Sequence, residues 1–298
     1  MRGSHAPSLR TIARRALATE LALAPPIVIV AACSGGPDST AMLHVLATLR
    51  SSLGVRLSAC AVDHGLRPEA EREIDVVRKV AASLDVPLDV MKLSVAPGAN
   101  LMARAREARY AALREVKATR GAAFVATGHT ADDRAETVLL RILRGAGPRG
   151  LAVLPARSGD LLRPIVRARR SDVVRHIERF GLPTSADPSN ADPRFLRVRV
   201  RGEVLPVLES LAPRVVESLC ALADDLAAIV PSDDPLTGLG RRQRTVIEAA
   251  LKAAGGGPKR ARIRSSDREE VLVEVRDGAR VITELMSPKP SRRSRRAP

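Results

Sequence analysis

The sequence predicts an α/β fold built on a doubly wound parallel sheet, followed by a helical, basic C-terminal extension. Three observations predict it. Short apolar runs rich in β-branched residues alternate with segments of helical periodicity between residues 27 and 143. Polar turns follow the first, second and fourth of these runs. Aromatic residues make up only 1% of the chain, so the core must consist of Ala, Val, Leu and Ile.

The alternation defines the elements in order. Four runs are expected to be strands, at residues 27–32, 57–62, 88–93 and 122–127. Helical patterns follow them, at residues 42–49, 69–84, 100–119 and 131–143. In a sheet of this kind, ligands lie beyond the carboxyl ends of the strands. We therefore expect the functional site at the edge where the polar turns lie.

The pattern changes after Gly150, and the chain divides into four parts. Residues 1–24 are expected to hold an N-terminal helix. The main domain should span residues 25–230, with a basic helical part from about residue 151. Residues 231–286 would form a small, reduced C-terminal region. Residues 287–298, with five basic residues and no acid, are expected to be a disordered tail.

Several segments of the later parts carry local signals. A helix capped by Ser171 is expected at residues 171–180, after a loop-rich link at residues 151–165. A polar loop and a mostly helical stretch should follow, at residues 183–193 and 196–229. A further helix and a short alternating run are expected at residues 241–253 and 271–275.

Positive charge dominates the composition. Lys and Arg number 49 against 33 Asp and Glu, a formal net charge of +16. Residues 141–214 alone contain 15 Arg, no Lys and seven acidic residues. Such an excess attracts polyanions, because phosphate contacts release counterions. Nucleic acid is the first candidate partner, and an anionic membrane surface is the second.

The cysteines indicate a reducing compartment. Cys33, Cys60 and Cys220 form no CxxC pair, so we expect reduced thiols, no structural zinc and a cytoplasmic protein. The longest apolar stretch, residues 21–33, is too short to span a bilayer. Residues 1–20 carry four Arg and no acid before Glu20. An amphipathic first helix explains this, with an organellar transit peptide as the alternative.

The turn after the first strand is suited to binding phosphate. It comprises Ser34, Gly35, Gly36, Pro37, Asp38, Ser39 and Thr40. The glycines let the backbone approach an anion, and the start of the next helix presents free N–H groups and a positive dipole end. A carboxylate in such a place is explained if Mg²⁺ bridges Asp38 and phosphate. The alternative is a plain glycine turn, with Asp38 or Ser39 as N-cap.

This turn resembles the SGGxDS loop of the N-type ATP pyrophosphatases, which binds the β,γ-pyrophosphate of ATP while the bond at the α-phosphorus is cut. Further segments match in the same order: residues 61–67, 105–110, 127–137, 144–147, 163–165 and 187–190. Together they resemble the tRNA(Ile)-lysidine synthetase family over roughly residues 20–230. The resemblance implies a Rossmann-like fold of the adenine nucleotide alpha hydrolase type.

The resemblance also implies a reaction and a site. ATP would adenylate the wobble cytidine in the anticodon loop of an isoleucine tRNA, and free L-lysine would then displace AMP. The turn at residues 34–40 would bind ATP, with His64 and His129 beside it. Asp38 and Asp133 would hold Mg²⁺ or the lysine amine. Arg109, with Arg106 as a second candidate, would stabilise the charge that develops in the transition state.

The residues themselves leave blander alternatives open. Arg106 and Arg109 share a helix face that could simply be solvated, and Asp132 and Asp133 could cap a helix. His129 could be a structural hydrogen-bonding group. Val198 stands where the family usually has Asn, a departure that bears on how tRNA docks. A homodimer is an open alternative to a monomer. A tRNA thiolase and a non-catalytic basic RNA-binding protein are the competing functions.

Overall fold

In the computed structural model the chain forms two compact units, one of residues 1–137 and 154–221 and one of residues 138–153 and 222–298. The structure describes residues 7–20, 26–63, 70–93, 98, 101–185, 192, 194–229, 259–266, 269–276 and 279–286. Among these residues, no helix combines the length and the apolar character that crossing a membrane requires.

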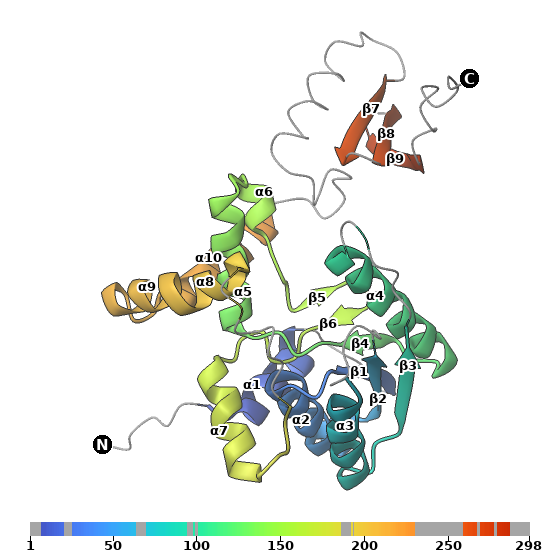
Figure 1. Ribbon diagram of the computed structural model, residues 1–298, viewed down its shortest axis with the longest axis vertical. Helices are drawn as coiled ribbons and strands as arrows, with labels where there is room; N and C mark the ends of the chain where they lie inside the picture. Colours follow the sequence, from blue (N-terminus) through green and yellow to red (C-terminus); the bar gives the residue numbers. More distant parts are fainter. Residues whose placement is uncertain are drawn as a thin grey trace, which may run out of the picture. The chain divides into compact units, whose positions relative to one another are not determined.

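A six-stranded sheet forms the centre of the first unit (Figure 1). Its strand order is β3-β2-β1-β4-β6-β5, with bounds Leu88–Lys92, Val55–Asp63, Ile27–Cys33, Phe124–Ala126, Leu161–Leu162 and Arg157–Ser158. All neighbours pair in parallel except β5, which is antiparallel to β6. The predicted parallel sheet is confirmed. The link at residues 151–165 is loop-rich as expected, and it also contains β5 and β6, which are too short to leave a periodic pattern.

Helices cover both faces of this sheet, as a doubly wound fold requires (Figure 1). On one face lie α1, α2, α3 and α7, with bounds Leu9–Arg15, Pro37–Leu53, Ala70–Ser83 and Arg170–Phe180. The other face is covered by α4, which spans Leu101–Thr119. Alternate residues of β1 divide between the two cores: Ile29 and Ala31 face the first, and Val30 faces the second. This period of two follows from the pleat of a strand.

The sheet changes direction of winding between β1 and β4, which are neighbours although β2 and β3 lie between them in the sequence. Ligands bind at such a switch point in open α/β sheets. Gly128 follows β4 and touches the start of α2. A Cβ added there would lie 2.9 Å from the backbone O of Asp38, so only glycine permits this contact. The polar turns after β1 and β4 therefore lie side by side.

Two helix starts differ from expectation. The N-cap of α2 is Gly36 with Pro37 in the first position, so neither Asp38 nor Ser39 caps it. The N-cap of α7 is Arg169 rather than Ser171. The reason is Asp172, whose Oδ2 accepts a hydrogen bond from the N–H of Arg169 over 2.8 Å. An acidic side chain at the third helical position thus bonds back to the N–H of the capping residue, which fixes the helix start at Arg169.

The remaining segments of the chain are largely helical. A π-helical turn, Ala16–Glu20, continues α1. The predicted helical character of residues 196–229 is confirmed by α8 (Leu196–Arg199), a π-helical turn (Val200–Val204), α9 (Leu205–Leu211) and α10 (Val215–Ile229). The helix α5 (Ala131–Leu143) follows β4 as expected.

The second unit contains α6 (Pro148–Leu151) and an antiparallel sheet of β7 (Lys259–Ser266), β8 (Glu269–Arg276) and β9 (Ala279–Met286). The alternating run at residues 271–275 lies within β8. The helix predicted at residues 241–253 and the tail at residues 287–298 lie outside the described residues.

Candidate active site

The glycine turn after β1 is braced by its own hydroxyl groups. Ser39 Oγ donates to the O of Gly36 over 3.0 Å and accepts from the N–H of Ser34 over 3.2 Å. Thr40 Oγ1 donates to the O of Gly35 over 3.4 Å. The protons of both hydroxyls therefore fix the shape of the turn. The backbone N–H groups at the start of α2 then carry the proposed anion binding.

Asp38 lies in the first turn of α2, and its Oδ1 is buried without a hydrogen-bond partner in the part of the chain that the structure describes. Burial, and then the nearby carboxylate of Asp133, raises the pKa of Asp38 to about 6, while Arg170 and Arg201 act in the opposite direction. A buried carboxylate oxygen without a partner is costly unless a cation binds it. Asp38 is therefore well placed to hold a metal ion or an ammonium group.

Asp133, on the first turn of α5, is buried and fully engaged. Its Oδ2 accepts from the N–H and the Oγ1 of Thr130 over 2.9 and 3.0 Å. Its Oδ1 accepts from Arg197 over 2.9 Å and from Arg170 over 3.3 Å. Burial acts to raise the pKa of Asp133, but the bond from Thr130 and these two cations lower it below the usual range. The structure thus brings Asp133 beside Asp38, already ionised and paired.

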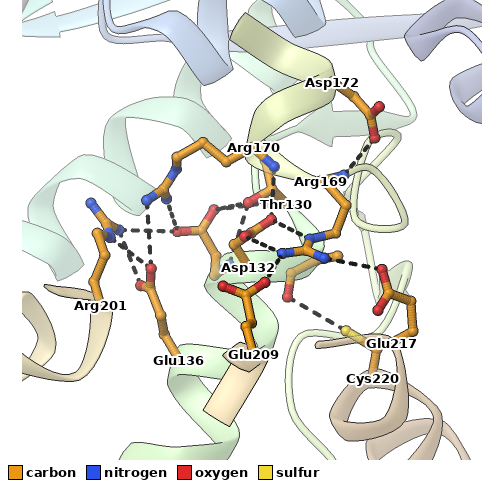
Figure 2. A network of polar contacts seen from close by, with 12 residues as sticks. Thr130, Asp132, Glu136, Arg169, Arg170, Asp172, Arg201, Glu209, Glu217 and Cys220 are labelled. Atoms are coloured by element: carbon orange, nitrogen blue, oxygen red, sulfur yellow. Dashed lines mark hydrogen bonds and ion pairs between the residues drawn. The ribbon is translucent and has the colours of Figure 1, made fainter. Parts of the chain in front are cut away.

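Glu136 was missed by sequence reasoning. It lies on the same face of α5 as Asp133, is fully buried, and binds Arg201 through two bonds of 2.6 and 3.0 Å. Arg197 donates to it as well, over 2.8 Å. Arg170 lies 3.6 Å from the carboxylate of Glu136 (Figure 2). The signal that could have found it is its spacing of three residues from Asp133, which places both on one helix face.

Asp132 belongs to a different part of the same network (Figure 2). Its carboxylate accepts a forked pair of bonds from Arg169, both 3.2 Å, and one from the N–H of Arg170 over 2.7 Å. The guanidinium of Arg169 also donates to Glu217 over 3.1 Å and to Glu209. One arginine therefore ties the start of α5 to α9 and α10.

His129 follows β4 and is neutral at pH 7. Its Nδ1 lies 3.0 Å from the Oγ1 of Thr127. Burial lowers the pKa of His129 to about 4; Asp133 acts to raise it, and Arg163 and Arg106 act to lower it. A neutral imidazole can donate or accept a hydrogen bond but adds no charge to the site. This agrees with a structural or ligand-orienting role for His129 rather than that of a cation.

Arg106 and Arg109 are brought together by Tyr110. Their guanidinium carbons lie 5.0 and 5.5 Å from the centre of its ring, and Arg106 also donates to its hydroxyl over 3.3 Å. Burial lowers the pKa of Arg109. Tyr110 acts to raise that pKa, and the neighbouring charge of Arg106 acts to lower it further. Arg109 is half-buried, whereas Arg106 is exposed, so the solvated alternative stays open for Arg106. His64 lies outside the described residues.

A magnesium ion fits the site only as a partly protein-bound ion. Among the described residues, no group of three or more His, Cys, Asp or Glu could hold a metal. Mg²⁺ usually binds one or two carboxylates together with phosphate oxygens and water. The partnerless oxygen of Asp38, with Asp133 beside it, fits an ion whose other ligands come from a bound phosphate.

Comparison with known proteins agrees with the fold and the site. A family model described as a PP-loop domain matches residues 9–208. The tRNA(Ile)-lysidine synthase of Thermobifida fusca is 38% identical over 86% of this chain and 79% of its own. The tRNA(Ile)-lysidine synthase of Salinispora arenicola is 42% identical over 84% of this chain and 74% of its own. The enzyme of the same name from Salinispora tropica is 42% identical over 73% of this chain and 68% of its own.

A solved structure supports the fold alone. The U34-tRNA thiolase NcsA from Methanococcus maripaludis, with its [4Fe-4S] cluster, superposes with a TM-score of 0.65 at 19% identity, covering 77% of this chain and 83% of that one. The family model covers most of this chain, and the curated relatives are similar along more than two thirds of their own lengths. The chain therefore belongs to the tRNA(Ile)-lysidine synthase family of PP-loop proteins.

Proposed function

We propose that this chain is an ATP-dependent carbon–nitrogen ligase that joins L-lysine to the wobble cytidine of an isoleucine tRNA, forming lysidine and releasing AMP and pyrophosphate. One observation carries the proposal. In a chain of this family, Asp38 has a partnerless Oδ1 and lies where the start of α2 meets Gly128, and the carboxylate of Asp133 on α5 is near enough to raise its pKa.

In the first step, O2 of the cytidine attacks the α-phosphorus of ATP. The O2–phosphorus bond forms, the bond to the β-phosphate oxygen breaks, and pyrophosphate leaves. The N–H groups at the start of α2 would bind the β- and γ-phosphates. Arg109 and Arg106 would neutralise the charge that develops at the α-phosphate, because a guanidinium keeps its charge and presents several donors.

In the second step, the ε-amine of lysine, after losing a proton, attacks C2 of the base. The nitrogen–carbon bond forms, the C2–O2 bond breaks, and AMP leaves with O2. Dividing one difficult displacement into two steps is the advantage of covalent activation. Asp38 would hold the lysine ammonium group or a magnesium ion through its partnerless oxygen, and Asp133, whose oxygens are already bonded, would add negative charge beside it. When bound, Mg²⁺ would supply positive charge between these carboxylates and the phosphates.

The tRNA is expected to dock by its anticodon loop, and the homologues' names support a tRNA(Ile) substrate. The role of free lysine, a homodimer and a cytoplasmic location stay predictions. The tRNA thiolase alternative is disfavoured. Burial, and then the neighbouring Cys60, raises the pKa of Cys33 to about 12. Burial, and then Asp89, raises the pKa of Cys60 to about 12 as well. Both thiols therefore stay protonated, whereas sulfur relay needs thiolates.

The proposed function is tested by incubating the purified chain with ATP, Mg²⁺, labelled lysine and an isoleucine tRNA bearing cytidine at the wobble position. We expect lysine to enter the tRNA with one AMP released for each lysine joined. Mass spectrometry of the nucleosides would identify lysidine. Binding of tRNA without AMP release would favour the non-catalytic alternative. AMP release without lysine incorporation would leave an adenylating enzyme with another acceptor.

A further inference from the structure

We propose that the backbone N–H of Ser185 is a positioning group for the nucleotide loop and sets the affinity of the ATP site. The inference rests on the proposed use of ATP and adds to the site a segment far from the loop in sequence. The N–H of Ser185 donates to the O of Gly35 over 2.8 Å. Gly35 is the first glycine of the turn after β1.

This bond controls a peptide plane that faces the proposed phosphate site. The peptide joining Gly35 and Gly36 is planar, so the O of Gly35 and the N–H of Gly36 point in opposite directions when it is trans. Whatever holds the carbonyl therefore aims the N–H. Gly36 is the N-cap of α2, where backbone donors bind anions. By binding the O of Gly35, the N–H of Ser185 thus fixes the direction of the Gly36 N–H on the other side of the same peptide group.

The plane needs an anchor, because a glycine pair is the part of a backbone that rotates most freely. Gly35 has a φ of +81°, a value that other residues rarely adopt, and an added Cβ would lie 2.8 Å from the O of Glu73. The loop's own anchor on this carbonyl is the hydroxyl of Thr40, at 3.4 Å. The bond from Ser185 is shorter by 0.6 Å and is the stronger restraint of the two.

Ser185 is held in place by the packing of α7 on α2. His44 on α2 and His176 on α7 share a hydrogen bond of 3.0 Å, and the ring of Phe180 packs 4.6 Å from that of His44. The helix α7 ends at Phe180 with Gly181 as its C-cap, whose φ is +57°, and the chain reaches Ser185 four residues after Gly181. The segment therefore braces α2 along its side and the loop at its N-terminus.

The experiment compares the full chain with Ser185→Ala, Ser185→Pro and a form in which the Thr184–Ser185 amide is replaced by an ester. Alanine keeps the N–H, whereas proline and the ester remove it. Binding of α,β-methylene-ATP with Mg²⁺ is measured by calorimetry, and the KM values for ATP and for tRNA are measured by AMP release. Circular dichroism melting identifies any variant that does not fold; the ester, which leaves the side chain unchanged, guards against a misfolded proline variant.

Loss of one backbone hydrogen bond should weaken nucleotide binding by about 3- to 10-fold. We expect this weakening, and a similar rise in the KM for ATP, for the ester and proline forms. Ser185→Ala should match the parent within about twofold, and the KM for tRNA should stay unchanged in all three. Equal nucleotide affinity of folded ester and parent would overturn the inference while leaving the ligase proposal intact. A parent that binds no nucleotide would overturn both.

Discussion

Asp132 and Asp133 are adjacent in the sequence, but their carboxylates bind different parts of the molecule. Asp132 accepts bonds from the side chain of Arg169 and the N–H of Arg170. Asp133 accepts from Thr130 and from the guanidinium of Arg197. Successive residues of an α-helix point about 100° apart, so two adjacent acids at a helix start naturally face different neighbours. Asp132 anchors α7, α9 and α10 through Arg169. Asp133 lies near Asp38 and raises its pKa.

Asp132→Asn and Asp133→Asn should therefore differ in effect. Removing the charge of Asp132 weakens a forked ion pair and leaves Arg169 with less compensation, so we expect a loss of about 1–3 kcal/mol in the free energy of unfolding. AMP release below the melting temperature should change little. Asp133→Asn should reduce AMP release at least tenfold more than Asp132→Asn. Urea unfolding and turnover of the two purified variants make the comparison, and equal turnover would contradict it.

Asp38→Asn should abolish turnover while making the protein more stable. The pKa of Asp38 is raised in the folded state, so its ionisation costs stability as the pH rises above the unfolded value of 3.8 and through about 6. An amide avoids that cost, by about 1–3 kcal/mol at pH 7.5. The stability gain should shrink at pH 4, where the carboxyl group is protonated in the folded state. A variant that is less stable than the parent at pH 7.5 would refute this account of Asp38.

Gly128→Ala should displace the loop from the switch point. The added Cβ would lie 2.9 Å from backbone atoms of Asp38 and 3.0 Å from the Cα of Ser39, and backbone cannot move aside cheaply. We expect a loss of about 1–3 kcal/mol in stability and a rise in the KM for ATP. Gly202→Ala is the matched control, because a Cβ at Gly202 meets nothing within 4 Å. It should leave turnover unchanged and stabilise the helix slightly.

The imidazole pair of His44 and His176 should make the protein sensitive to mild acid. Burial, then His44 and Arg179, lowers the pKa of His176 to about 4, and burial lowers that of His44. A lowered histidine pKa means full stability above the unfolded value of 6.5, lost as the pH falls from 6.5 towards 4. His176→Gln should therefore flatten the decline in unfolding free energy between pH 7 and 5. An unchanged slope would show that other groups govern the acid sensitivity.

Binding of tRNA should depend steeply on salt, but fewer arginines contribute than the sequence suggests. Tripling the salt concentration from about 0.1 M should weaken binding by more than about tenfold, because phosphate contacts release counterions. Arg197 binds Asp133 and Glu136, so Arg197→Gln should leave the slope of log affinity against log salt unchanged. Filter binding over a salt series measures both. A flat response of the parent would contradict the electrostatic contribution.

The periodicity of the sequence was sufficient to predict β1, β2, α2, α4 and α5, because each has a long amphipathic or buried pattern. The glycine turn was predictable because its residue types suit few other roles. The ion network was not, because Glu136 and Arg201 meet only through the tertiary fold and leave no local pattern. The bond from Ser185 to Gly35 was equally hidden, since any residue except proline supplies a backbone N–H.

The most direct test of the central claim is the identity of the nucleotide product when the chain turns over with ATP, L-lysine and a wobble-cytidine tRNA. Cleavage at the α-phosphorus, held by the turn at residues 34–40, predicts AMP and pyrophosphate in equal amounts, both dependent on tRNA. Accumulation of ADP and inorganic phosphate would place the reaction at the γ-phosphorus and contradict the account.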